Sequence, residues 1–519
     1  MSAVALPRAH ARQAALAAVC AILFLTFLDN TIVSVALADI QTSLSVSVSG
    51  LQWIVDGYML AFAALMLTGG TLGDLLGRKK VMLAGAAVFC AGSIVAALAP
   101  DTSTLITGRI VMGVGAAASE PGTLSLIRHI YPERAERAVA LGVWAAVSGL
   151  ALSLGPVIGG VLVAGVGWRS IFWFSLGFGA LALAGAAATL TESSDPEGRH
   201  LDVPGLAAGA GAITAATFAV IEGENRGYHT WWIGLLFAAA AALAVVFVLI
   251  ERRAPDPVLK LEFLRDPTFT AANVVAFATN LSVFSVFFFT ALYLQLISSF
   301  TGFQIALSFA ALAAAMIVSG PLAGRWTARV GPRVPMVLGC LLAGAGLLLV
   351  DWKLTATTTV AALTWPLAIA GLGFGIALVS MTAAVLTLVP PEQSGMAAST
   401  VNTSRELGGV FGVAVLGAVV NAQLTGGLTE KLIRLGIPKQ FRQIVIQIVT
   451  TGGSTNPADY PAARGHAGIV AKVLAAAEGS AGHGVHLALE IAGGIVIAAA
   501  LVALFAARHR TERRGELEL

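Results

Sequence analysis

Five ionisable side chains lie within long apolar stretches of this 519-residue chain: Asp29, Arg109, Glu120, Arg405 and Glu406. At the centre of a bilayer such a group costs at least about 2.5 to 3.5 kcal/mol, so it must face protein or water rather than lipid. Low-dielectric surroundings also disfavour the charged form of a carboxyl group. These residues are therefore the first candidates for exchanging a proton or holding a substrate.

Asp29 lies beyond the midpoint of the first apolar stretch, among Phe24, Phe27 and Leu28. A carboxyl group in such surroundings can gain and lose a proton near neutral pH, which a proton-coupled pump requires. The alternative is a structural carboxylate that is hydrogen-bonded to a neighbouring helix. The cost of placing a charge in the membrane favours the functional interpretation.

Arg109 and Glu120 share one apolar stretch and are eleven residues apart. On a helix this spacing is about 16 Å along one face, so they cannot pair with each other. Arg109 either meets a carboxylate of a neighbouring helix or extends its side chain outward for a structural reason. Glu120 precedes Pro121, so a capping or backbone-bonding role competes evenly with proton or substrate binding.

Arg405 and Glu406 are consecutive on one predicted helix, together with Asn402. Their side chains point about 100° apart and cannot both face one cavity squarely. Glu406 is either a second proton- or cation-binding group or the partner that neutralises a nearby arginine. Asp56, at the outer end of the second apolar stretch, is more typical of a solvated carboxylate at the membrane surface.

Phenylalanines recur at helical spacing in a later stretch, at Phe277, Phe284 and Phe288. This spacing is typical of helix packing or of a lipid-facing stripe. The alternative is an apolar drug cavity that also includes Phe24, Phe27 and Phe62.

The composition excludes most soluble classes of protein. Apolar residues make up 57% of the chain and charged residues 11%, whereas a soluble domain carries about 25% charged residues. The net charge of +3 indicates neither a nucleic-acid partner nor an acidic tail. The 8 histidines and 3 cysteines show no metal-ligand spacing, and no phosphate-binding loop occurs. We expect no enzyme activity, catalytic residue, metal site or cofactor.

The elements that must position the charged residues are membrane-spanning helices, since apolar runs of about 20 residues recur along the chain. We predict an all-α polytopic membrane protein with fourteen spans. They lie near residues 15–38, 51–72, 80–98, 104–128, 138–163, 169–190, 203–222, 230–250, 268–296, 304–326, 334–352, 358–388, 395–423 and 485–507. Spans seven and eight contain no charge that we expect to be buried.

The distribution of Lys and Arg predicts the orientation of the spans. If both termini are cytoplasmic, twenty of the 31 basic residues lie on the inside, and the short outside loops hold only Arg169, Arg226 and Lys353. We therefore expect a multi-pass protein of the cytoplasmic (inner) membrane with both ends inside. Heavy use of Ala, Gly, Val and Arg with little Lys is typical of a GC-rich bacterial genome.

A short motif occurs twice. The loop after span two reads Gly70-Thr-Leu-Gly-Asp-Leu-Leu-Gly77-Arg-Lys-Lys80, and the loop after span ten reads Gly324-Arg-Trp-Thr-Ala-Arg-Val-Gly331-Pro-Arg333. Taken alone, these could be two unrelated Gly-Arg turns. The offset of eight spans instead favours two six-helix halves separated by two inserted helices, a known arrangement of transporters.

This repeat predicts the domain organisation. Residues 1–190 form an N-terminal six-helix bundle, residues 191–267 hold two linker helices, and residues 268–519 form a C-terminal six-helix bundle. The second bundle includes a long extracytoplasmic loop at about 424–484, in which Phe441–Val449 could form a short amphipathic element over a cavity mouth.

The loop from Gly70 to Lys80 resembles the signature loop of the major facilitator superfamily, and the fourteen spans resemble its 14-helix drug:proton antiporter branch. Further matches are Leu28–Leu37 in span one, Gly108–Gly115 in span four and Arg405–Gly412 in span thirteen. Span five carries Gly155, Pro156, Gly159 and Gly160, similar to an element that marks exporters in this superfamily.

The resemblance implies roles for individual residues. It assigns Arg109 to proton coupling. It also implies that Gly70, Asp74, Gly77 and Arg78 form a conformational latch, in which Asp74 faces a helix N-terminus of the opposite half and leaves it when the halves rock.

The resulting functional hypothesis is proton-coupled efflux of amphipathic drugs or antibiotics across the cytoplasmic membrane by alternating access. The expected partners are an amphipathic small molecule, protons and membrane lipid, and we expect a monomer. The alternative on the same fold is a proton-coupled symporter that imports a nutrient or metabolite. A receptor or an embedded enzyme would need a soluble catalytic domain, metal ligands or a nucleophile–base set, and none is found.

Overall fold

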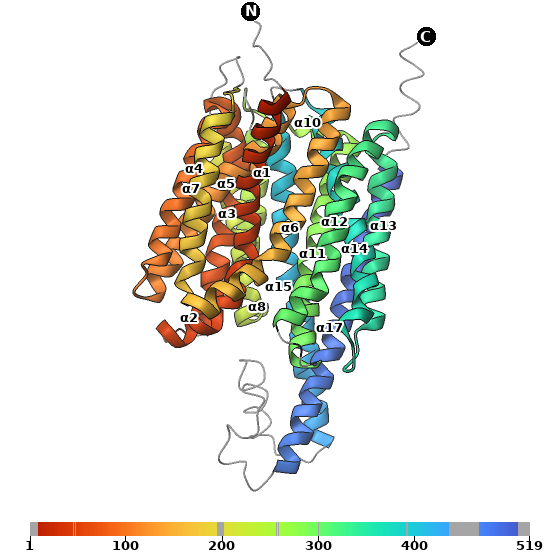
Figure 1. Ribbon diagram of the computed structural model, residues 1–519. Helices are drawn as coiled ribbons and strands as arrows, with labels where there is room; N and C mark the ends of the chain where they lie inside the picture. Colours follow the sequence, from red (N-terminus) through yellow and green to blue (C-terminus); the bar gives the residue numbers. More distant parts are fainter. Residues whose placement is uncertain are drawn as a thin grey trace, which may run out of the picture.

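The computed structural model describes residues 9–44, 46, 48–194, 202–255, 257, 259–298, 300, 302–390, 393–434 and 467–506. Within these residues the structure is helical and contains no β-strand. Fourteen helices are long and apolar enough to cross a membrane, as the sequence predicts. Figure 1 shows them as a bundle in which the described ends of α1 and α17 lie at the same end. We call that end the terminal face and the other end the opposite face.

The helices fall into three sets along the chain. The first half comprises α1 (Ala9–Ile32), η1 (Val33–Ala36), α2 (Leu37–Leu44), α3 (Val48–Leu76), α4 (Arg78–Ala97), α5 (Thr102–Ile130), α6 (Arg134–Val166) and α7 (Arg169–Thr189). The inserted helices are α8 (Val203–Arg226) and α9 (Trp231–Glu251), followed by the short α10 (Leu261–Arg265). The second half comprises α11 (Pro267–Leu296), α12 (Gly302–Val330), α13 (Arg333–Lys353), α14 (Val360–Leu388), α15 (Ser394–Arg434) and α17 (Ala467–Ala506).

Local sequence signals set the helix ends. The Asp101 side chain accepts a hydrogen bond from the backbone N–H of Thr104 and so caps the start of α5. Gly77 separates α3 from α4 with φ of 111°, and Gly331 separates α12 from α13 with φ of 85°. Residues with side chains rarely adopt such values. The two copies of the Gly-Arg motif therefore share a backbone geometry as well as a sequence pattern.

Two seams join the halves. One lies between α6 and α12, and the other between α3 and α15; α15 also contacts α5. Gly324 of α12 packs directly against the backbone of Ala138 in α6, where a Cβ atom would collide with the Ala138 carbonyl oxygen. The crossing is close because neither residue carries a large side chain. The halves are thus in contact near the ends of α3 and α12, which the alternation of spans places on the terminal face.

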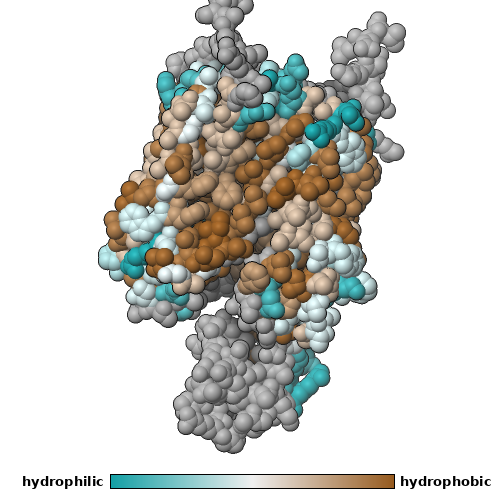
Figure 2. Space-filling model, viewed as in Figure 1, coloured by the Kyte–Doolittle hydropathy of each residue, from teal (hydrophilic) through white to brown (hydrophobic). Residues whose placement is uncertain are grey.

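The surface has the pattern expected of a membrane protein. Figure 2 shows hydrophobic residues over the middle of the visible face, with hydrophilic residues gathered toward its two ends. Large apolar side chains such as Val161 of α6 and Leu181 of α7 are more than two-thirds exposed in the chain alone, at 71% and 74%. Lipid is the environment that suits this exposure.

The inserted helices are not peripheral to the bundle. The helix α8 packs against α3 of the first half and α15 of the second half, and α9 packs on α8. The expectation that these spans hold no buried charge was wrong, because Glu222 of α8 is 3% exposed and Glu251 of α9 is 5% exposed. Both acids stand at the ends of their spans, where sequence alone suggests contact with water.

The predicted loop at about 424–484 was too long at both ends. Residues 424–434 continue α15, and α17 begins at Ala467, so two helices extend along each other beyond the rest of the bundle (Figure 1). Leu428 and Leu432 are fully buried, and Lys431 Nζ donates to the Ala476 carbonyl. This apolar pairing outweighs the local preference of Gly426 and Gly427 for a turn. The segment Phe441–Val449 lies outside the described residues.

Candidate functional site

Asp29 and Arg109 form an ion pair in the interior of the first half. Asp29 lies on α1 and Arg109 on α5, and each is 1% exposed. Arg109 Nη1 donates to Asp29 Oδ2, while Asp29 Oδ1 has no hydrogen-bond partner among the described residues. Of the two sequence-based alternatives for Arg109, the structure therefore shows the one in which it meets a carboxylate of a neighbouring helix.

The remaining contacts of Arg109 fix its position against α3. Its Nε donates to the carbonyl oxygen of Ile54 over 2.9 Å. The guanidinium carbon also lies 4.4 Å from the centre of the Tyr58 ring, whose hydroxyl donates to the Thr26 carbonyl. One guanidinium thus links α1, α3 and α5. Loss or gain of the Asp29 charge would be felt by all three helices.

A second charged cluster joins the two halves. Glu120 of α5 and Arg405 of α15 are 0% and 1% exposed at their side chains, and their nearest charged atoms are 3.8 Å apart. That distance is too long for a hydrogen bond. Arg405 Nη1 donates instead to Asn402 Oδ1 over 3.0 Å. Both carboxylate oxygens of Glu120 lack a hydrogen-bond partner within the described part of the chain, which argues against the capping role considered from the sequence.

Aromatic rings enclose the Arg405 guanidinium. Its carbon atom lies 5.1 Å from the centre of the Phe27 ring and 5.2 Å from that of the Trp144 ring. These two rings pack edge to face at 6.4 Å, and Trp144 Nε1 donates to Thr123 Oγ1. Phe27, Trp144 and Glu120 all belong to the first half, whereas Arg405 comes from the second.

Glu406 is also part of the buried region. It is 6% exposed, and its charge acts on both Glu120 and Arg405. Within the described part of the chain it forms no direct ion pair with Arg405. The structure therefore gathers Glu120, Arg405 and Glu406 at one place, with one more acid than arginine.

The glycines of span five let α6 approach α1 close to Asp29. A Cβ atom at Gly155 would collide with the Thr31 hydroxyl, and one at Gly159 would collide with Val35. The Thr31 hydroxyl also donates to the Leu152 carbonyl. Pro156 continues the backbone of α6, and no atom lies within 4 Å of the Cβ position of Gly160. Only two of the three predicted glycines are thus needed for this crossing.

The first span changes to a 3-10 helix at Val33–Ala36, next to this crossing. A short 3-10 stretch inside a longer helix is a common mark of a hinge. The irregular turn therefore lies between the ion-paired Asp29 and the opposite face.

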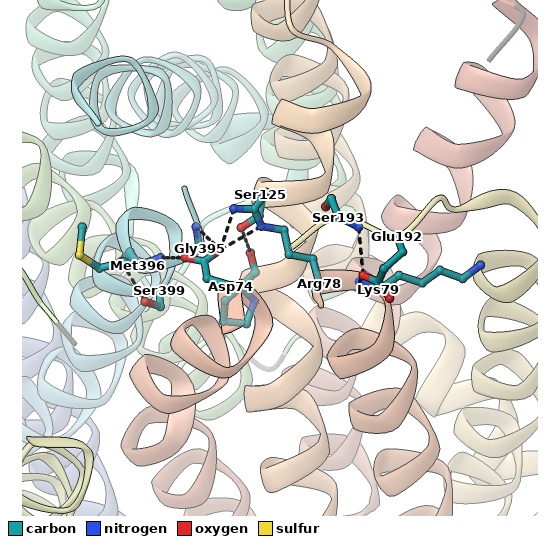
Figure 3. A network of polar contacts seen from close by, with 10 residues as sticks. Asp74, Arg78, Lys79, Ser125, Glu192, Ser193, Gly395, Met396 and Ser399 are labelled. Carbon is teal, nitrogen blue, oxygen red and sulfur yellow. Dashed lines mark hydrogen bonds and ion pairs between the residues drawn. The ribbon is translucent and has the colours of Figure 1, made fainter. Parts of the chain in front are cut away.

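The latch residues lie at the seam between α3 and α15, shown in Figure 3. Asp74 accepts hydrogen bonds from the backbone N–H groups of Gly395 and Met396 over 3.1 and 2.9 Å. These N–H groups begin α15, where the first turn lacks intrahelical partners and the helix dipole is positive. Arg78 Nε donates to the same carboxylate over 2.9 Å.

Three glycines make this contact possible, and the most direct is Gly395, where a Cβ atom would collide with the Asp74 carboxylate. A Cβ atom at Gly70 would collide with the Ser399 side chain of α15. Gly77 allows the tight turn into α4, whose first N–H groups, at Lys79 and Lys80, donate to the Glu192 carboxylate. Asp74 of the first half thus meets the N-terminus of a helix of the second half, and the role of this contact as a conformational latch stays a prediction.

A further contact crosses the halves on the same face. Arg128, near the end of α5, donates from Nη2 to the carbonyl of Val389 over 2.8 Å. Val389 is the C-cap residue that follows the last residue of α14, at the end where the helix dipole is negative. The turn from α14 to α15 is thus held at its start by a cation and at its end by an anion, each matched to the helix end that it meets.

Comparison with known proteins identifies the family. Residues 19–413 match the family model described as the Major Facilitator Superfamily. The chain belongs to the Major Facilitator Superfamily. It is therefore a membrane transporter, and members of this superfamily carry small molecules rather than catalyse reactions.

Relatives of this superfamily member carry names that refer to drug resistance. The chain is 34% identical to the multidrug resistance protein Stp of Mycobacterium tuberculosis over 84% of this chain and 80% of that protein. It is 36% identical to the methylenomycin A resistance protein of Streptomyces coelicolor over 76% of this chain and 83% of that protein. The human organic anion transporter MFSD10 (TETRAN) shares the fold, with a TM-score of 0.61, 15% identity, and coverage of 95% and 99% of the two chains.

The sequence analysis missed two aromatic residues that contact the buried charges of this superfamily member. Tyr58 and Trp144 contact the two buried arginines, yet in the sequence they are aromatic residues within apolar runs, like many others. Asp56 is partly exposed, and the charge of Glu222 acts on it, so its interpretation as a carboxylate at the membrane surface stays a prediction.

Of the phenylalanines considered for a cavity, Phe288 is 51% exposed, as a lipid-facing stripe requires. Phe62 is fully buried and packs against the ring of Tyr58. Phe27 contacts the buried guanidinium of Arg405. Of these phenylalanines, the one seen against a charge in the described part of the chain is thus on the first span, not on span nine.

Proposed function

We propose that this transporter exports amphipathic drugs or antibiotics across a bacterial cytoplasmic membrane in exchange for protons, by alternating access. The terminal face is the cytoplasmic face, since its loops hold most of the Lys and Arg residues. The observation that carries the proposal is the buried ion pair of Asp29 and Arg109, in which one carboxylate oxygen has no hydrogen-bond partner in the part of the chain that the structure describes.

Protonation of Asp29 would remove its attraction for Arg109, which then keeps only the Ile54 carbonyl and the Tyr58 ring. Because Arg109 contacts α3 as well as α1, the change would reach the helix that carries the latch. Proton binding and the helix arrangement are thus coupled through the interaction free energy of the Asp29–Arg109 ion pair.

Alternating access then depends on the terminal-face contacts. With Asp74 bound to the start of α15 and Arg128 bound to the end of α14, the two halves are joined on that side. Breaking these contacts would let the cytoplasmic side open to cargo. The protonated state and the cargo-bound state favour opposite faces, which makes the exchange obligatory.

The direction of transport is supported by the relatives and by α6. Two curated relatives are named for resistance to drugs, and export is the simplest way in which a transporter gives resistance. The close crossing at Gly155 and Gly159 belongs to the element typical of exporters.

A drug-susceptibility panel tests the proposal directly. The chain is expressed in a bacterium that lacks its own efflux pumps, beside Asp29→Asn and the control Glu136→Gln, which alters an ion pair with Arg12 in the same half. We expect raised inhibitory concentrations for some amphipathic compounds with the wild type and the control, and none with Asp29→Asn. Equal protection by Asp29→Asn would refute the role of the carboxylate.

A further inference from the structure

The aromatic pocket around Arg405 is built by one half and filled by the other. Phe27 of α1, Trp144 of α6 and Glu120 of α5 surround the guanidinium, which enters from α15. We call Phe27, Trp144 and Glu120 the cation box. Its three members would stay together when the halves move apart, because all of them lie in the first half.

The chemistry of the cation box is that of an organic-cation site. Aromatic ring faces attract a cation within about 6 Å, and the attraction grows when water is excluded. Trp144 is 1% exposed and Phe27 is 2% exposed. Glu120 adds a negative charge at the same place, and its side chain is 0% exposed.

The Arg405 guanidinium makes few hydrogen bonds within the cation box. Among the residues that the structure describes, neither oxygen of Glu120 accepts a hydrogen bond, and Arg405 Nε has no acceptor. The amide nitrogen of Asn402 is likewise without a partner among them. A buried ion pair stabilises a protein only when its geometry is good and its remaining polar atoms are bonded. The Arg405 head group is therefore a replaceable occupant rather than a permanent structural partner.

We infer that the cation box binds the positively charged end of an amphipathic organic cation, and that Arg405 competes with this cargo for the same position. The inference rests on the proposed export function and names the class of its substrate. In the arrangement described here Arg405 holds the box, and cargo binds when α15 withdraws.

The position of Arg405 on α15 links this competition to the latch. Arg405 follows Gly395 by ten residues, which is about 15 Å along the helix. The same helix therefore presents its first N–H groups to Asp74 and its guanidinium to the cation box. When Asp74 releases α15, Arg405 leaves the box, and its return displaces the cargo. The return of Arg405 thus empties the cation box before the next transport cycle.

An anionic cargo bound to Arg405 is the competing arrangement. It would bring a negative charge against Glu120, and Glu406 lies near enough for its charge to act on both. When both Glu120 and Glu406 are ionised they face the single positive charge of Arg405, so in that state a further cation rather than a further anion balances the cluster.

The test uses two probes of equal shape and opposite charge, tetraphenylphosphonium and tetraphenylborate. Equilibrium binding of each is measured on the full chain in lipid nanodiscs, without a pH gradient. The variants are Arg405→Gln, Phe27→Leu and Phe27→Tyr. The control is Phe89→Leu, which removes a buried ring in α4. Each variant is first checked for a single peak in size-exclusion chromatography.

We expect tetraphenylphosphonium to bind the wild type, about tenfold more tightly to Arg405→Gln, and about tenfold more weakly to Phe27→Leu. Phe27→Tyr and Phe89→Leu should bind as the wild type does. The inference is overturned if Phe27→Leu binds the cation normally, or if Arg405→Gln binds it no more tightly than the wild type. It is also overturned if tetraphenylborate is preferred and lost in Arg405→Gln.

Failure of this inference is distinguishable from failure of the export function. If the susceptibility panel shows protection that requires Asp29 while tetraphenylphosphonium does not bind, the cation box is wrong and the exporter remains. If the cation binds as expected and no compound is exported, the proposed function is wrong.

Discussion

Replacing Asp74 by Asn is expected to open the terminal face. The substitution keeps the shape of the side chain and removes its negative charge. Asp74 accepts two hydrogen bonds from the start of α15 and one from Arg78. Only the two bonds to α15 cross between the halves, so only these enter the equilibrium between the closed and open arrangements.

The size of the effect follows from these two bonds. A hydrogen bond to a charged group contributes about 1.5 to 3 kcal/mol, and one between neutral groups about 0.5 to 1.5 kcal/mol. Asn has a single acceptor oxygen, whereas Gly395 and Met396 donate to different oxygens of Asp74, so one bond becomes neutral, at about 1 kcal/mol, and the other is lost, at about 2 kcal/mol. Since 1.4 kcal/mol is a factor of ten, a total of about 3 kcal/mol should raise the ratio of open to closed molecules about a hundredfold.

Spin-label distances measure this ratio. Labels at Glu133→Cys and Arg329→Cys lie on exposed positions at the ends of α6 and α12, one in each half. The native cysteines Cys20, Cys90 and Cys340 are buried and are replaced beforehand. Double electron–electron resonance should show one short distance in the parent protein and a longer distance added in Asp74→Asn.

The matched control is Asp101→Asn. Asp101 also places a carboxylate at a helix N-terminus, but it caps α5 within its own half. This variant should keep the short distance. An unchanged distance distribution in Asp74→Asn, or an equal change in Asp101→Asn, would show that the contact with α15 does not hold the terminal face closed.

Three further predictions concern the packing and the charges. Gly155→Leu should collide with Thr31 and abolish protection against drugs while Gly160→Leu, which meets open space, retains it; equal activity of both variants in the susceptibility panel would contradict the packing argument. Asp29→Asn should lower the melting temperature because it leaves Arg109 buried without a counter-charge, at a cost of about 3 to 5 kcal/mol, and Asp29→Asn/Arg109→Gln should recover much of it. Thermal unfolding that ranks the double variant below the single one would refute the pairing. Gly77→Ala should also lower the melting temperature, by the equivalent of about 1 to 3 kcal/mol, because φ there is 111°; an unchanged value would mean that the turn relaxes.

The fourteen spans could be predicted from the sequence because burial in lipid imposes long apolar runs, which are visible without any knowledge of packing. The end of α15 at Arg434 and the start of α17 at Ala467 could not be predicted in this way. Residues 424–434 contain Gly426, Gly427, Glu430 and Lys431, which are typical of a loop in water. They are helical because Leu428 packs within the paired helices, and that contact depends on a segment far away in the chain.

The candidate site, too, could be predicted only in part from the sequence. The insertion cost singled out Asp29, Arg109, Glu120, Arg405 and Glu406 from their types alone. It could not show that Asp29 pairs with Arg109, which is 80 residues away, or that Arg405 reaches across to the first half. Partner choice between helices is a property of packing, and many pairings satisfy the same apolar pattern.

Aromatic residues were the hardest to assign. In a membrane span, Phe and Trp face lipid, pack in the core or contact a charge with no difference in local sequence. Trp144 becomes significant only because α6 presents it beside Phe27 to an arginine of another half. The residues from Gly70 to Arg78 could be picked out because they are contiguous in the sequence, although Gly395, which donates to Asp74, comes 321 residues later.

Proton release during transport tests the central claim most directly. The protein is reconstituted into liposomes with an acidic lumen that contains the pH-sensitive dye pyranine. The added compound is the one with the largest change in the susceptibility panel. Proton exchange predicts that the compound accumulates as the lumen becomes more alkaline, and that nigericin or Asp29→Asn abolishes both signals. Accumulation that persists after nigericin, with no change in lumen pH, would contradict it.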